Sequence, residues 1–152
     1  MEPQIRFCTS ADGTRIAYTT MGEGPPLVHV PGWMGNVERD LKDPDSRAFM
    51  ETLSRGRLLV TFDRRATGAS QRDVDEVSLD AEVADVAALV DHLRLERFDL
   101  GGVSEAAAIA VAYAARHPER VCRLVLWSPY RCGEGIARLG AIRSLIELIR
   151  EN

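Results

Sequence analysis

The sequence predicts an α/β fold, a three-layer α/β/α sandwich in which helices cover both faces of a mostly parallel sheet. Two observations support this prediction. Short apolar segments with strand character alternate along the chain with segments whose apolar residues recur at helical spacing. Glycine, proline and aspartate separate these segments. Such sheets bind ligands beyond the carboxyl ends of their strands, so the loops at those ends are the expected location of a functional site.

Six segments are predicted to be strands. Residues 5–9 and 15–20 flank Asp12-Gly13, a strong signal for a hairpin turn. The other four strands are largely apolar along their whole length, as expected of strands buried on both faces. They span residues 27–30, 58–62, 98–103 and 121–127.

Four segments have helical character. They span residues 45–54, 79–93, 105–116 and 136–149. Ser78 is a suitable N-cap for the second helix, and Pro118 ends the third. The fourth helix has an apolar stripe that begins at Ile136 and ends at Ile149.

Composition excludes several classes of protein. The chain has 152 residues, 45% hydrophobic and 28% charged, which is typical of one soluble globular domain. Its net charge is −4 with no basic block, so no nucleic-acid partner is expected. No apolar run approaches the ~20 residues of a membrane span, and the N-terminus lacks the pattern of a signal peptide. These features predict a cytoplasmic protein with no membrane partner.

The three cysteines, Cys8, Cys122 and Cys132, are odd in number and widely spaced. We expect Cys8 and Cys122, which lie in predicted strands, to be small buried apolar side chains. No pair has the spacing of a metal site, so neither a metal nor a cofactor is expected. Free cysteines fit the reducing cytoplasm.

One stretch has the pattern of a catalytic motif. Residues 98–109 run from an apolar strand through two glycines and Ser104 into an alanine-rich helix. This is the order of a nucleophile elbow, in which a strained turn holds a serine at the carboxyl end of the sheet. Such a turn needs small residues two positions before and after the serine, and Gly102 and Ala106 meet this need. The alternative is an ordinary strand-to-helix turn with Ser104 as N-cap.

Three motifs in this order resemble the α/β-hydrolase family. They are the strand and loop Leu27-Val28-His29-Val30-Pro31-Gly32-Trp33, the loop Asp63-Arg64-Arg65-Ala66-Thr67-Gly68-Ala69-Ser70, and the elbow Gly102-Val103-Ser104-Glu105-Ala106. The chain resembles the N-terminal half of that family from residue 4 onward. Its likeness is greatest to hydrolase domains fused to bacterial cyclases or helix-turn-helix regulators. The resemblance implies a truncated α/β-hydrolase fold, with residues 1–152 as one partial domain.

The resemblance also implies roles for individual residues. Ser104 would be the nucleophile of an esterase-like serine hydrolase that cleaves a small ester or related substrate by acyl transfer. The backbone N–H groups of Glu105 and Trp33 would form the oxyanion hole. We expect the loops 31–36 and 63–70 to converge on the elbow, with Asp63 and Arg64 bracing the loop beneath it.

The sequence departs from the family pattern in four places. Pro31 replaces a histidine, while Ala66 and Ala106 replace glycines; Ala66 would be strained if its position requires positive φ. The largest departure is the lack of a catalytic base and acid after the elbow. His29, His92 and His117 are all expected to be structural or surface residues, and Glu134 is a remote option for the acid.

Two functions follow as alternatives. The chain could be part of a serine hydrolase that is weakly active or inactive alone, or a non-catalytic module derived from a hydrolase that binds or senses a small ligand. A truncated reading frame without its own function is a third option. The strand 121–127 would form an apolar sheet edge, which predicts self-association or a complementing chain. The segment 136–152 would be either the start of a cap or a core helix.

Overall fold

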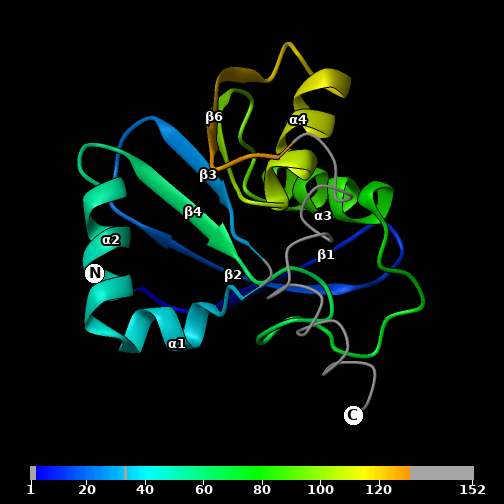
Figure 1. The fold of residues 1–152 in the computed structure, drawn as a ribbon, viewed down its shortest axis with the longest axis horizontal. Coiled ribbons are helices and arrows are strands. Elements are labelled where there is room, and N and C mark those ends of the chain that lie inside the picture. Colours follow the sequence, from blue (N-terminus) through cyan, green and yellow to red (C-terminus); the bar gives the residue numbers. More distant parts are fainter. Residues whose placement is uncertain (1–2, 33, 131–152) are drawn as a thin grey trace.

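The computed structural model describes residues 3–32 and 34–130. These residues form one six-stranded sheet with helices on both faces, which confirms the predicted three-layer arrangement (Figure 1). The strands are β1 (Arg6–Thr9), β2 (Arg15–Met21), β3 (Pro26–Val30), β4 (Leu58–Phe62), β5 (Phe98–Val103) and β6 (Val121–Trp127). The helices are α1 (Val37–Lys42), α2 (Pro44–Leu53), α3 (Leu79–His92) and α4 (Ala106–Arg116).

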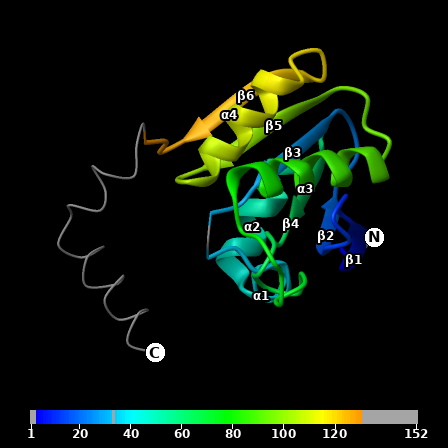
Figure 2. The same cartoon turned by 90° about the vertical axis from the view of Figure 1, so that its right-hand side faces the viewer.

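The sheet has the order β1-β2-β4-β3-β5-β6, so β1 and β6 form its two edges (Figure 2). An antiparallel hairpin of β1 and β2 attaches to β4. The other pairs, β3 with β4, β3 with β5, and β5 with β6, are parallel. The carboxyl ends of β3, β4 and β5 therefore meet at the same end of the sheet.

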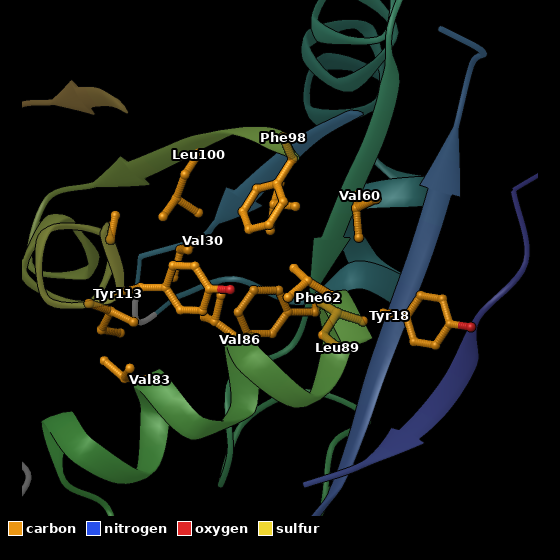
Figure 3. Close-up of a cluster of buried hydrophobic side chains, with 14 of the residues drawn as sticks. Tyr18, Val30, Val60, Phe62, Val83, Val86, Leu89, Phe98, Leu100 and Tyr113 are labelled. Carbon is orange, nitrogen blue, oxygen red and sulfur yellow. The ribbon is translucent and has the colours of Figure 1, made fainter. Parts of the chain in front are cut away.

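Helices α3 and α4 cover one face, which holds most of the hydrophobic core. Figure 3 shows Val83, Val86 and Leu89 of α3 packed against side chains of the central strands. Tyr113 brings α4 into the same cluster beside Phe98, with ring centroids 5.8 Å apart. Alternation along the strands decides which side chains join this core, because successive residues point to opposite faces.

The opposite face carries α2. Phe49 of α2 lies beside His29 of β3 and Trp127 of β6, with ring centroids 6.4 and 5.7 Å away. Within residues 3–32 and 34–130, no helix on this face contacts β5 and β6 as extensively as α4 does on the other face, although Phe49 of α2 reaches Trp127. Val125 and Trp127 are consequently 55% and 59% exposed.

Two features differ from the sequence prediction. Helix α1 was not predicted, because six residues contain too little apolar periodicity; the side chain of Asn36 caps it by accepting from the N–H of Arg39. Cys8 is buried as expected, whereas the prediction for Cys122 was wrong: it is exposed because it lies on the edge strand β6.

Some predictions concern residues outside the described ranges. They are the helix 136–149, the roles of Cys132 and Glu134, and the possible start of a cap in the segment 136–152. Among the helices that the structure does describe, none combines the length and apolarity needed to cross a bilayer.

Candidate active site

Ser104 lies in the sharp turn between β5 and α4, and its φ is +55°. A non-glycine residue rarely adopts this left-handed conformation, which costs about 1–2 kcal/mol. The turn is held on both sides: the N–H of Ser104 donates to the carbonyl of Trp127 at 2.9 Å, and the N–H of Ala107 donates to the carbonyl of Ser104 at 3.2 Å. The helix begins at Ala106 with Glu105 as its N-cap residue, so Ser104 is not the N-cap of α4.

The small residues around Ser104 are required by packing. A Cβ atom on Gly102 would lie 2.8 Å from the Cα of Ala107 and 2.9 Å from the carbonyl oxygen of Ala106. Both atoms belong to the backbone, so neither could move aside without shifting α4. Ala106 is itself fully buried. The first turn of α4 thus lies directly against β5.

The loops after β3 and β4 converge on this turn, as predicted. The carboxylate of Asp63, just after β4, accepts from the N–H of Val37 at 2.7 Å. Arg64 donates to Glu105 at 2.6 Å, which links the β4 loop to the turn. A Cβ on Gly32 would lie 3.7 Å from Oε2 of Glu105, so the loop after β3 lies against the same carboxylate.

Asp63 organises the loop 63–70 from inside. It is fully buried, and its second carboxylate oxygen accepts from the N–H of Ala69 at 2.7 Å. Burial raises the pKa of Asp63 above its usual value, although these two N–H donors act in the opposite direction. Ala66 has a φ of +63°, so this position does adopt the conformation that favours glycine.

A buried ion pair anchors the same loop to α3. Arg65 donates two hydrogen bonds of 2.7 Å to the carboxylate of Asp85, and both side chains are about 1% exposed. Arg65 also donates to Asp12 in the β1–β2 hairpin at 2.9 Å. Arg65 therefore ties the loop beneath Ser104 to both α3 and the β1–β2 hairpin.

The three histidines do not assemble with Ser104. His29, in the middle of β3, has Nδ1 3.2 Å from the hydroxyl of Thr61, and burial lowers its pKa to about 4. His92, near the end of α3, has Nε2 3.1 Å from the hydroxyl of Tyr18. His117 follows the C-terminus of α4, about 16 Å from its start for 11 residues at ~1.5 Å each. This agrees with the predicted structural roles.

Comparison with known proteins decides the family. A family model described as "alpha/beta hydrolase fold" matches residues 25–146, which is most of the chain. The chain belongs to the α/β-hydrolase fold family. A non-heme haloperoxidase of Rhodococcus erythropolis is 34% identical over 121 residues, covering 79% of this chain and 42% of that protein.

A second relative, the 2-hydroxymuconate semialdehyde hydrolase of Pseudomonas sp. strain CF600, is 34% identical over 125 residues, covering 82% of this chain and 43% of that protein. The solved structure of a hydrolase from Pseudomonas aeruginosa PA01 superposes with a TM-score of 0.76 at 25% identity, covering 97% of this chain and 52% of the other. The chain thus spans about two fifths of the length of these curated relatives.

Of the residues predicted for the α/β-hydrolase site, the structure brings Ser104 and Glu105 together beside Gly32. Trp33, the other predicted oxyanion donor, lies outside the described residues. Sequence reasoning did not identify the partners of Arg64, which are Glu82 and Glu105, each 2.6 Å away. The only available signal was the opposite charge of Arg64 in the motif 63–70 and Glu105 in the motif 102–106, and Glu82 lies in neither motif.

A hollow of about 310 Å³ lies on the second face of the sheet, below the Ser104 turn. Its walls are mainly apolar and include Leu27, Phe49, Val103 and Trp127. Arg57 and Asp99 close one end with an ion pair of 2.5 Å. A cavity of this size and character could accept a small apolar group.

Proposed function

We propose that the chain carries the nucleophile and oxyanion-binding part of an esterase-like serine hydrolase. The observation that supports this most strongly is the positive φ of Ser104 at the carboxyl end of β5, next to the N-terminus of α4. This conformation has a cost in folding free energy, and such strain clusters at functional sites. Ser104 is the proposed nucleophile, and the N–H groups of Glu105 and Trp33 are the proposed oxyanion donors.

The proposed chemistry is acyl transfer from a small ester. The Oγ of Ser104 attacks the carbonyl carbon and loses its proton to a base, and the carbonyl oxygen becomes an oxyanion that accepts from the two N–H groups. Collapse of this intermediate expels the alcohol, which takes up the proton. Water then hydrolyses the acyl-serine to a carboxylic acid and restores the hydroxyl. One such donor contributes about 2.7–4 kcal/mol to the transition state.

The base for this reaction has to come from a group other than the three histidines, which all lie away from Ser104. The curated relatives are more than twice as long as the region that matches this chain. We propose that the acid and the base belong to a polypeptide segment equivalent to the remainder of those relatives. Without them, oxyanion binding still leaves a rate of ~10³–10⁴ over water in comparable hydrolases.

A fluorophosphonate probe tests the proposal, since it forms a stable bond with an activated serine and releases fluoride. The chain would be labelled with and without added imidazole as an external base, and the adduct located by mass spectrometry. We expect slow labelling at Ser104, faster labelling with imidazole, and none in Ser104→Ala. His117→Ala is the matched control and should label like the wild type. A folded chain that shows no Ser104 adduct with imidazole contradicts the proposal.

A non-catalytic module that binds or senses a small apolar ligand is the second candidate. The apolar hollow below the Ser104 turn supports it, as does the absence of a histidine near Ser104 among the described residues. In that case Ser104→Ala would leave the binding of an apolar dye unchanged, and no adduct would form. The cytoplasm stays the predicted compartment for either function.

A further inference from the structure

Arg64 lies between two carboxylates that come from different parts of the fold. Its guanidinium contacts Glu82 in the first turn of α3 and Glu105 after Ser104, both at 2.6 Å. All three side chains are mostly buried, with exposed fractions of 13% for Arg64, 10% for Glu82 and 24% for Glu105. Charge-assisted hydrogen bonds of this length fix orientation well, particularly away from bulk water.

The same contacts hold together the elements that carry the proposed oxyanion donors. The carboxylate of Glu105 lies against Gly32, whose Cβ position would be 3.7 Å from Oε2. Gly32 directly precedes Trp33 in the chain. Arg64 thereby connects α3 to the Ser104 turn directly, and to the loop after β3 through the side chain of Glu105.

Charge makes this contact important for the proposed chemistry. Glu105 supplies one of the proposed N–H donors, and its carboxylate lies against Gly32, the residue before the other proposed donor. We infer that the carboxylate lies near the position where the oxyanion would form. Two negative charges at short range in a partly buried site repel each other strongly. An adjacent guanidinium compensates that charge and restrains the carboxylate at a fixed position.

We propose that Arg64 is a positioning residue of the acyl-transfer site. It holds the Glu105 side chain toward Gly32 and neutralises it, so that the N–H of Glu105 stays aimed at the oxyanion and the carboxylate does not oppose it. This inference rests on the proposed function of Ser104. It assigns to Arg64 a role beyond bracing the loop.

The test measures the rate of Ser104 labelling by the fluorophosphonate at pH 8, with imidazole present. The phosphoryl oxygen of the probe would occupy the same oxyanion position. We expect Arg64→Met to label at least ~10-fold more slowly at pH 8, because the variant lacks the guanidinium that contacts the Glu105 carboxylate. Arg64→Lys keeps the charge and should retain more of the rate.

The decisive variant is Arg64→Met combined with Glu105→Gln. Removing the carboxylate should restore labelling to within ~3-fold of the wild type, a rescue that a purely structural role would not produce. Arg116→Met is the matched control, because Arg116 pairs with Asp80 on the exposed surface between α3 and α4. If Arg64→Met fails to fold, the neutral variant Arg64→Gln with and without Glu105→Gln gives the same comparison.

The outcomes separate the two proposals. Wild-type labelling at Ser104 with an unchanged rate in folded Arg64→Met overturns the role of Arg64 alone. Loss of rate in Arg64→Met that Glu105→Gln does not restore also overturns it. A wild-type chain without any Ser104 adduct overturns the proposed function and this inference together.

Discussion

At the scale of single residues, two of the four described non-glycine residues with positive φ lie in loops that converge on the candidate site. Ser104 and Ala66 have φ values of +55° and +63°, and they lie in the turn after β5 and in the loop after β4. The two residues differ in the role of their side chains. The turn at Ser104 presents a side chain with proposed chemistry, whereas the methyl group of Ala66 has no evident function. Strain at Ala66 should therefore be removable.

We expect Ala66→Gly to raise the free energy of unfolding by about 0.5–1 kcal/mol, because glycine adopts positive φ without the penalty that a Cβ imposes. The gain is reduced by the greater entropy of glycine in the unfolded chain. Chemical denaturation measures the difference. Ala69→Gly is the control: Ala69 lies in the same loop without positive φ and should be destabilised. Equal effects in both variants would contradict this explanation.

At the scale of elements, the sequence was sufficient to predict all six strands within one residue or so at each end, because apolar runs bounded by turn residues are strong local signals. It also predicted that three loops would meet at Ser104, since parallel strands place their carboxyl ends together. It could not predict which side chains pair across those loops. Arg64 finds Glu82 through a contact 18 residues away in the chain, and only the folded geometry selects that partner.

The contact between β5 and α4 provides a sharp test of element packing. Gly102→Ala places a Cβ within 3.0 Å of two backbone atoms in α4, and should destabilise the fold by about 1–3 kcal/mol through overpacking. Gly101→Ala is a matched control in the same strand, because its Cβ would lie 3.8 Å from the nearest atom, the carbonyl oxygen of Val28. We expect thermal unfolding to shift clearly in Gly102→Ala and little in Gly101→Ala. A larger shift in Gly101→Ala than in Gly102→Ala would show that α4 lies farther from β5 than the structure places it.

At the scale of the whole molecule, the sheet is protected unevenly. The β1–β2 hairpin forms one edge, and β6 forms the other with β5 as its only partner strand among the residues described. Leu124 and Val125 of β6 are 39% and 55% exposed and point to opposite faces. An apolar edge strand with unpaired backbone groups is a template for another strand. The backbone N–H and C=O groups on the outer side of β6 can form strand hydrogen bonds only with a second polypeptide segment.

We therefore expect the purified chain to self-associate at micromolar concentration through β6, in the absence of a complementing segment. Sedimentation velocity measures the distribution of species. Leu124→Lys should increase the monomer fraction, because a lysine on an edge strand opposes strand pairing and keeps its charge in water. Val111→Lys is the matched control: Val111 is similarly exposed, at 44%, but lies on α4, away from the sheet edge. A wild-type chain that sediments as a monomer, or equal dissociation in both lysine variants, would show that β6 is not the contact.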